Sequence, residues 1–267
     1  MSRDAGPPVT TSINTANDPI AYPLPADCED VDQQQNSAPA SAVECINVAA
    51  LTLNLLDLGD TGFTLGVADG VTWNGGDGND TLTGSDGSQA PNGGTGADTM
   101  AGGNGNDTLD GGDGSDPDLS GGGGNDVITG GAGNDSMSGN AGTDELSGDA
   151  GDDQMSGGAD PDVLRGGDDD DTLNGGTGTD TLNGQAGDDD ASGGDDNDLV
   201  DGGTGDDSLD GDAGTDTVLG GEGAGSLTGS EGSDTLLGGE GADVLSDDAG
   251  PDPDVLRGGA DSDLLLA

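Results

Sequence analysis

The most informative absences in this sequence are those of basic and aromatic side chains. The chain has 267 residues, with no histidine, no lysine, three arginines and three aromatic residues. It contains no HExxH or GxSxG motif, and without histidine or lysine the commonest general bases are missing. Pairs of carboxylates recur along the chain, but no separate cleft-forming domain accompanies them. The sequence therefore indicates a protein that is not an enzyme.

Long apolar runs are also absent. No stretch of 18 apolar residues occurs, which excludes a transmembrane helix, and the N-terminal sequence MSRDAGPPVTTS lacks the apolar centre of a cleaved signal peptide. The 56 acidic residues give a formal net charge of -53. Nucleic acid and anionic membrane surfaces are poor partners for such a charge.

Cysteine is scarce, and both residues precede residue 46. We expect a disulfide between Cys28 and Cys45, which would contribute about 3 kcal/mol by closing a short loop and would imply an oxidising location. Two free thiols are the alternative. No Cys-x-x-Cys motif or histidine partner supports zinc or redox chemistry.

What the chain has in abundance is a nine-residue repeat, Gly-Gly-x-Gly-x-Asp-x-apolar-x, which runs from residue 75 to residue 266. It appears as GGDGNDTLT at 75–83 and as GGTGTDTLN at 175–183, and we count 21 units. Asp holds the sixth position in 19 units, and an apolar residue holds the eighth in 20. High charge with low hydrophobicity ordinarily predicts disorder. A disordered chain, however, is not expected to keep a constant nine-residue spacing. Adaptation to high salt would place Asp at all nine positions of the repeat. It can therefore contribute to the Asp content, but it does not explain why Asp holds the sixth position.

The repeat predicts a thin solenoid with two units in each coil. The last three residues of a unit alternate out-in-out as a minimal strand, and the glycines provide positive φ or close backbone approach. Leu82, Met100 and Leu119 are expected to stack on one side, and Leu109, Ile128 and Leu146 on the other. Pro91, at an eighth position, marks a distorted second unit.

Stacked coils place the sixth-position Asp residues above one another, about 4.8 Å apart. Neighbouring carboxylates then repel by about 3 kcal/mol at an effective dielectric of about 20, so the ladder needs cations. Calcium accepts carboxylate and carbonyl oxygens in irregular geometry, magnesium needs a stricter octahedron, and soft metals want Cys or His. The predicted calcium ligands are Asp80, Asp98, Asp107, Asp116, Asp126, Asp135, Asp144, Asp153, Asp162, Asp171, Asp180, Asp189, Asp198, Asp207, Asp216, Asp234, Asp243, Asp254 and Asp263.

This motif resembles the calcium-binding nonapeptide of the RTX (repeats-in-toxin) family, over about the last three quarters of the chain. The resemblance implies a right-handed parallel β-roll in which each ion takes one Asp from each of two stacked turns, plus carbonyls of the glycine-rich segments. The 21 turns offer 19 stacked pairings and up to about 19 ions. Pairings that involve Gln89 or Gly225 should bind weakly.

Departures from the motif leave some interpretations open. Asp replaces the fourth-position glycine at 160, 169, 196, 252 and 261; it either adds a ligand or occupies a turn that Asp tolerates, and we favour the turn. Arg165 and Arg257 lie on one outer face, where they are either solvated or paired with acids of a neighbouring molecule, and we favour solvation. The same face carries apolar outward residues that suggest lateral packing: Val127, Val163, Leu199, Leu219, Leu237 and Val255.

The expected architecture is all-β and has three parts. Residues 1–44 form an extended arm, residues 45–74 form an apolar strand region that caps the roll or pairs with a neighbouring subunit, and residues 75–267 form the roll. Residues 46–58 favour strands, although a buried helix remains an alternative.

Two functions from different classes fit these features. The first is a secreted, calcium-rigidified structural protein that assembles head to tail into a filament, sheath or surface layer, with a possible cell-surface association. The second is a calcium-triggered folding module, or an adhesin segment, of an RTX-like secreted protein. In RTX proteins such modules precede a C-terminal secretion signal, which only the tail Asp263–Ala267 matches weakly here.

Overall fold

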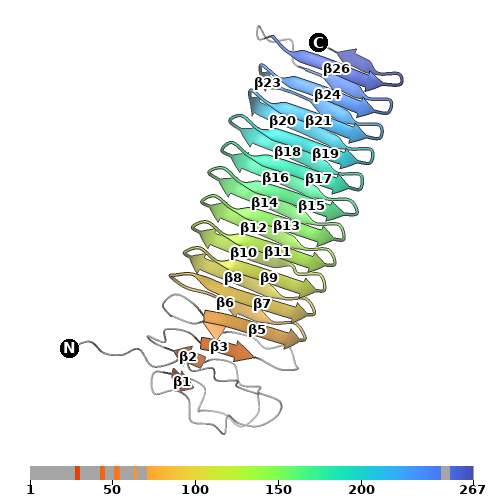
Figure 1. The fold of residues 1–267 in the computed structure, drawn as a ribbon. Helices are drawn as coiled ribbons and strands as arrows, with labels where there is room; N and C mark the ends of the chain where they lie inside the picture. Colours follow the sequence, from red (N-terminus) through yellow and green to blue (C-terminus); the bar gives the residue numbers. More distant parts are fainter. Residues whose placement is uncertain are drawn as a thin grey trace, which may run out of the picture.

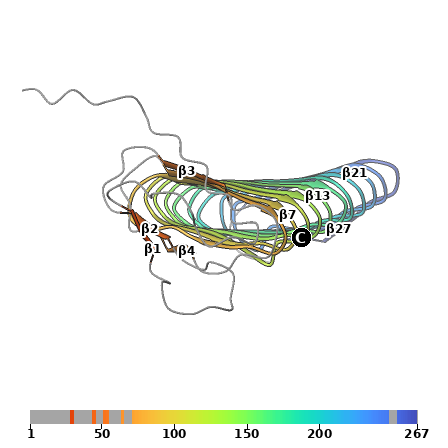
Figure 2. The same ribbon diagram turned by 90° about the horizontal axis from the view of Figure 1, so that it is seen from below.

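The computed structural model describes residues 28–30, 43–45, 51–54, 63–64, 71–247 and 253–266. These residues form strands, turns and bends only, and none of them belongs to a helix long and apolar enough to cross a membrane. The strands stack into a long rod (Figure 1). Seen along its length, each coil is a flattened loop in which two sheets face one another (Figure 2).

Both large sheets are parallel, because every second unit contributes to the same sheet. The 12-stranded sheet comprises β3 (Leu51–Asn54), β5 (Val71–Asp77), β7 (Gln89–Thr95), β9 (Thr108–Asp113), β11 (Val127–Ala132), β13 (Glu145–Ala150), β15 (Val163–Asp168), β17 (Thr181–Ala186), β19 (Leu199–Thr204), β21 (Thr217–Glu222), β24 (Thr235–Glu240) and β26 (Val255–Ala260). The 13-stranded sheet comprises β4 (Phe63–Thr64), β6 (Thr81–Thr83), β8 (Thr99–Asn104), β10 (Asp118–Gly123), β12 (Ser136–Ala141), β14 (Gln154–Ala159), β16 (Thr172–Thr177), β18 (Asp190–Asp195), β20 (Ser208–Gly214), β22 (Ser226–Thr228), β25 (Val244–Ser246) and β27 (Leu264–Leu266), with β23 (Glu231–Gly232) beside β20. The predicted solenoid with two units per coil is confirmed.

The core is a seam of eighth-position side chains from the two sheets. Leu82 pairs with Met100 in one sheet, and Leu109 pairs with Ile128 in the other, as the periodicity predicts. Nearly all of these side chains are fully buried. Trp73 extends the seam by one coil, because its register partner in the next coil is Pro91.

The strands before the repeats continue both sheets. In the 12-stranded sheet Leu53 is opposite Trp73, and in the 13-stranded sheet Phe63 is opposite Leu82. β3 covers part of the segment predicted as strand, and the rest of 46–58 lies outside the described residues, as does most of the predicted arm. The assignment of 45–74 as a cap or a subunit interface stays a prediction.

At the junction of the predicted arm (1–44) and the predicted strand region (45–74), β1 (Cys28–Asp30) and β2 (Val43–Cys45) form an antiparallel pair. The register sets Cys28 directly opposite Cys45. Directly opposed residues in antiparallel strands have Cα atoms about 4.5–5.5 Å apart, a separation that a disulfide spans. The backbone therefore suits the disulfide, which stays a prediction.

Glycines of the repeat serve the backbone in two different ways. At nearly all second and fourth positions φ is positive, as at Gly176 (110°) and Gly178 (133°). First-position glycines such as Gly175 have no positive φ, and are instead crowded by neighbouring atoms. The Asp residues at fourth positions 160, 169, 196 and 261 adopt φ of 74–83° and are exposed. This geometry supports the turn interpretation for these four; Asp252 lies outside the described residues.

Candidate metal sites

The sixth-position Asp residues form two stacked rows, one for each set of turns. All 19 predicted ligands take part, and 17 of them are 0–4% exposed. Asp254 and Asp263, in the last coil, are half-buried. One row is interrupted at Gly225, and the other begins above Gln89. The sequence thus predicted which side chains the turns enclose.

A backbone-to-carboxylate hydrogen bond connects successive Asp residues along each row. The backbone N–H of Asp153 donates to Oδ1 of Asp171 at 2.8 Å, and the N–H of Asp171 donates to Oδ1 of Asp189 at 2.8 Å. The same bond recurs from coil to coil in both rows. In these pairs one carboxylate oxygen fixes the stacking of two successive coils.

The second oxygen, Oδ2, is buried and accepts no hydrogen bond along most of both rows. The residues in this state are Asp98, Asp107, Asp116, Asp126, Asp135, Asp144, Asp153, Asp162, Asp171, Asp180, Asp189, Asp198, Asp207, Asp216 and Asp243. A buried polar atom without a partner costs about 1–3 kcal/mol, and more when it is charged. Fifteen such atoms in register are a strong indication that a positively charged species belongs beside them.

The unpartnered oxygen converges with a carbonyl of the next coil. A Cβ placed on Gly166 would lie 2.2 Å from Oδ2 of Asp171 and 2.6 Å from the carbonyl oxygen of Gly184. A Cβ on Gly148 would likewise lie 2.1 Å from Oδ2 of Asp153 and 2.5 Å from the carbonyl oxygen of Gly166, and the arrangement recurs along the rod. First-position glycine is therefore required where the carboxylate and the carbonyl come together.

Burial makes these carboxylates hard to ionise in the absence of a cation. Desolvation raises the pKa of Asp171 to about 7, the N–H donated by Asp153 lowers it, and the charges of Asp153 and Asp189 raise it again. The pKa values of Asp135, Asp162 and Asp198 rise to about 7 for the same leading reason. Neutralisation by protons or by a metal therefore favours this packing.

These oxygens fit a hard divalent cation. The enclosed donors are carboxylates and backbone carbonyls, with no nitrogen or sulfur ligand, which is the donor set of calcium. Stacked Asp residues and the first-position glycine carbonyls would hold the ion, and the ion would supply the positive charge that the ladder lacks. The number of ions stays a prediction.

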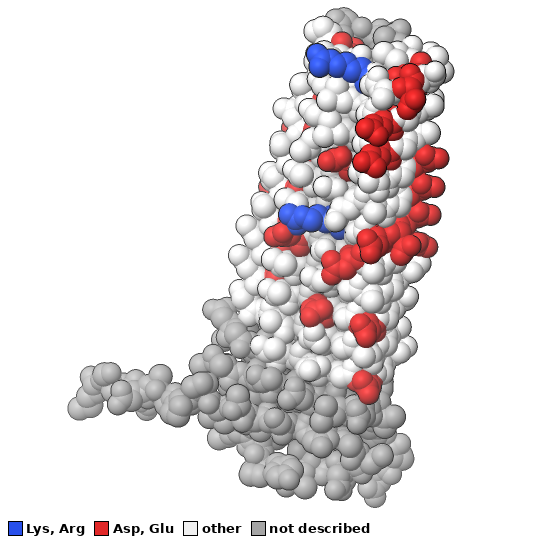
Figure 3. Space-filling model, turned by 45° about the vertical axis from the view of Figure 1, so that its right-hand side comes forward, with Lys and Arg blue, Asp and Glu red and all other residues white. Residues whose placement is uncertain are grey.

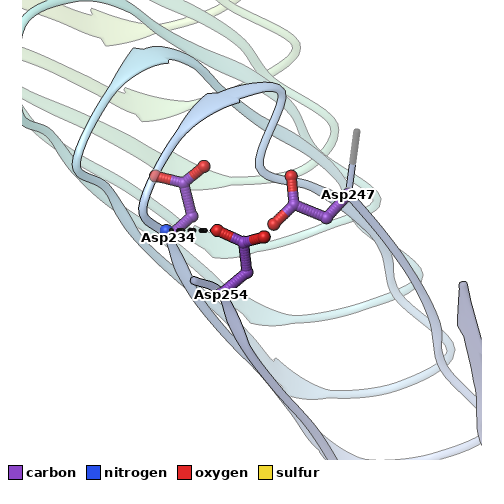
Figure 4. A group of neighbouring side chains, drawn as sticks. All are labelled: Asp234, Asp247 and Asp254. Atoms are coloured by element: carbon purple, nitrogen blue, oxygen red, sulfur yellow. Dashed lines mark hydrogen bonds between the residues drawn. The ribbon is translucent and has the colours of Figure 1, made fainter. Parts of the chain in front are cut away.

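Near the C-terminal end a third carboxylate joins the row. One oxygen atom from each of Asp234, Asp247 and Asp254 lies within 4.8 Å of the others (Figure 4). The N–H of Asp234 donates to Oδ1 of Asp254 at 3.3 Å. Asp247 belongs to a two-residue insertion between units, which the motif does not cover. Sequence reasoning missed this residue, although an acidic insertion was the available signal.

A further set of carboxylates lies outside the turns. Fifth-position Asp residues stack on one edge and are exposed, and the N–H of Asp188 donates to Oδ1 of Asp170 at 2.8 Å. Figure 3 shows acidic side chains gathered along one edge of the rod, beside a largely uncharged face with two basic side chains. Exposed carboxylates are solvated, so they do not need the cation that the buried rows need.

One prediction about the arginines is wrong. Arg165 is neither simply solvated nor directed to another molecule, because its Nη1 donates to Oε1 of Glu145 at 2.6 Å in the same chain. Glu145 and Arg165 stand in adjacent strands, β13 and β15, two positions apart across the register, where side chains of this length meet. The pair is exposed and worth at most about 1 kcal/mol.

Comparison with known protein families gives one match. The model described as RTX calcium-binding nonapeptide repeat (4 copies) matches residues 74–88, 92–116, 120–155, 156–191, 192–227 and 219–252. The matched segments cover more than half of the chain and contain most of both Asp rows. No curated protein matches the chain.

Proposed function

Because the chain belongs to the family of RTX calcium-binding nonapeptide repeats, we propose that it is an extracellular structural protein that calcium converts into a rigid rod. The observation that carries this proposal is the set of fifteen buried Asp residues, spread over both rows, whose Oδ2 atoms accept no hydrogen bond. Proteins with such repeats are generally secreted. Folding then takes place where calcium is plentiful.

Circular dichroism tests the calcium dependence directly. Metal-free protein at neutral pH should give a coil spectrum that becomes rich in β-structure on addition of millimolar calcium, with magnesium far less effective because it demands a tighter octahedron. A spectrum that is the same with calcium and with chelator would contradict the proposal.

We propose further that the rod assembles end to end with other copies of the chain. Among the described strands, β26 pairs only with β24 and β27 only with β25, so each leaves one edge open. Leu265 occupies a core position but is 46% exposed. An open parallel edge beside exposed core residues is suited to adding another coil. At the other end of the rod β3 is the last described strand of its sheet, whereas β4 contacts β2. A repeated contact of this kind that does not close gives a filament.

Lateral packing is a second mode of assembly that we propose for the outer face of the 12-stranded sheet. Val127, Leu199 and Val255 are 38–41% exposed there, and Leu219 and Leu237 occupy one column of the register. The calcium-free net charge of -53 opposes contact between rods. Calcium would remove much of that repulsion, so lateral packing should also depend on calcium.

Electron microscopy and light scattering of calcium-folded protein separate these modes. Linear polymers that Leu265→Asp abolishes and Leu199→Asp preserves support end-to-end assembly, while side-by-side bundles that only Leu199→Asp abolishes support lateral packing. Monodisperse rods at all concentrations would overturn both and favour the alternative, a calcium-triggered folding module or adhesin segment. The possible cell-surface association is tested by binding of the folded rod to intact cells.

A further inference from the structure

Gln89 stands at the sixth position, where 19 of the 21 units carry a ligand Asp. Its side chain forms hydrogen bonds inside its own turn. The side chain is 3% exposed. Its Nε2 donates to the carbonyl oxygen of Gly87 at 2.7 Å and to that of Asp86 at 3.2 Å. Its Oε1 accepts the N–H of Ser85 at 3.2 Å. Every polar atom of this amide therefore has a partner within its own turn.

The backbone of Gln89 still takes part in the ladder. Its N–H donates to Oδ1 of Asp107 at 2.7 Å, the same bond that joins successive Asp residues elsewhere. In the next turn of that row, by contrast, Oδ2 of Asp107 is buried and unpartnered. Gln89 thus keeps the stacking bond of an Asp turn and lacks the buried charge that calls for a cation.

We propose that the amide of Gln89 takes the place of a calcium ion, and that the coils around residues 71–92 fold without metal and template the calcium-dependent coils. The amide N–H groups donate to the carbonyls of the third and fourth positions of the same turn, Asp86 and Gly87. This inference rests on the proposed calcium dependence of the remaining rod. It concerns one end of the solenoid and assigns a direction to its folding.

The neighbourhood of Gln89 is correspondingly poor in charge. Its register partner in the preceding coil is Val71, so no ligand carboxylate stands there. Residues 71–92 contain three acidic residues, of which only Asp80 is buried and belongs to a ligand row, whereas the equally long segment 151–172 contains eight acids and one arginine. Repulsion opposes folding much less in the first segment, because Coulomb energy grows with the number of close like charges.

Apolar packing gives this segment its own stability. Trp73 is 1% exposed, and it pairs in register with Leu53 on one side and Pro91 on the other. Burial of the aromatic ring is favourable, although the indole Nε1–H of Trp73 is buried without a hydrogen-bond partner. Three strands of each sheet, β3, β5 and β7 with β4, β6 and β8, bracket the segment, which is about the number of coils a solenoid needs for stability.

A break in the sheet sets this segment apart from the metal-binding coils. β7 pairs with β5 from the position of Gln89 onward, but it pairs with β9 only from Asn92 onward. Pro91 has no N–H to donate, which accounts for the shortened pairing. Solenoids fold by nucleation and propagation between neighbouring repeats, so a preformed coil at this boundary determines where propagation starts.

The chain carries its own fluorescent reporter, because Trp73 is its one tryptophan. In chelator at neutral pH, the wild-type protein should keep the blue-shifted emission of a buried indole, and amide exchange should be slowed in 71–92 but not in 107–243. Gln89→Asp should lose both signals in chelator, with exchange at least about tenfold faster, and regain them in calcium. Asp77→Asn, an exposed position in the same coil, is the matched control and should behave as wild type.

The reverse substitution strengthens the test. Asp107→Gln should extend slowed exchange in chelator by one rung and lower the calcium stoichiometry. Emission of Trp73 in chelator that equals the emission in concentrated guanidinium would overturn the proposal, as would a Gln89→Asp variant that matches wild type. Slow exchange along the whole rod in chelator would instead contradict the calcium dependence of the proposed function, so the two failures are distinguishable.

Discussion

The backbone N–H of Asp135 donates a 2.8 Å hydrogen bond to Oδ1 of Asp153, one coil further along the rod. Each carboxylate is thereby divided: one oxygen aligns the coils, and the other faces the enclosed turn. A side chain that keeps the first acceptor and loses the charge should therefore preserve stacking and weaken metal binding.

The substitution Asp153→Asn tests whether coil stacking and metal binding can be separated in this way. The amide keeps an oxygen in the place of Oδ1 and removes a buried negative charge, so the metal-free protein should be more stable while calcium stoichiometry falls by one or two ions. Removal of both Asp135 and Asp153 with alanine should lower the cooperativity of calcium-induced folding. Equilibrium dialysis and calcium titrations followed by circular dichroism measure these effects. Asp152→Asn, at an exposed fifth position, is the control; equal losses in both variants would show that general charge, not the enclosed site, holds the ions.

First-position glycine should be essential to the site although it supplies no side chain. A Cβ at Gly166 would lie 2.2 Å from Oδ2 of Asp171 and 2.6 Å from the carbonyl of Gly184. Gly166→Ala should therefore remove calcium from this turn without removing a carboxylate, and raise the calcium concentration needed for folding. Gly123→Ala is the matched control, because its Cβ would meet only Oδ1 of Asn104 at 3.3 Å. If both variants titrate like wild type, the carbonyl and carboxylate are not joint ligands.

Acidic pH should partly substitute for calcium in stabilising the folded state. The pKa of Asp171 is raised from 3.8 to about 7 by burial, so between about pH 4 and pH 7 the folded state binds more protons than the unfolded state. Since stability rises with pH only where the unfolded state binds more protons, metal-free stability should fall as pH increases through this window. Calcium must displace these protons, so its affinity should rise over the same window. Circular dichroism of metal-free protein between pH 7.5 and pH 5 measures the change. A loss of β-structure on acidification would contradict the prediction.

The strict nine-residue phase made much of the rod predictable. Leu82 over Met100, and Asp107 beside Asp126, follow from spacing alone, because two units per coil fix every neighbour in a parallel sheet. Trp73 was missed as a core residue, since the segment before it has neither the glycines nor the Asp of the motif. Its place in the core depends on register with Pro91, which is a property of the folded sheet.

Other features depend on side-chain geometry that spacing does not encode. The two oxygens of an Asp are equivalent in the sequence, so the division of Asp153 into an aligning and an enclosed oxygen could not be read from it. The pairing of Arg165 with Glu145 depends on side-chain reach across strands. Gln89 was predicted only to weaken a site, because its internal hydrogen bonds require the turn conformation.

Backbone strain provides a last prediction, at Gln185. This residue occupies a second position, usually glycine, with φ of 78°, and its side chain is exposed. A left-handed conformation costs a residue with a Cβ about 1–2 kcal/mol, whereas glycine adds about 0.4–1 kcal/mol of unfolded-state entropy. Gln185→Gly should therefore stabilise the calcium-loaded rod by about 0.5–1 kcal/mol.

Denaturant unfolding in saturating calcium measures the change, and Gln185→Ala is the control because it removes the side chain but keeps the Cβ. Alanine should leave stability nearly unchanged. A gain with alanine equal to that with glycine would show that the long side chain, and not φ, destabilises the turn. Fourth-position Asp169, with φ of 77°, should gain less on substitution by glycine, because Asp tolerates the left-handed region better than Gln does.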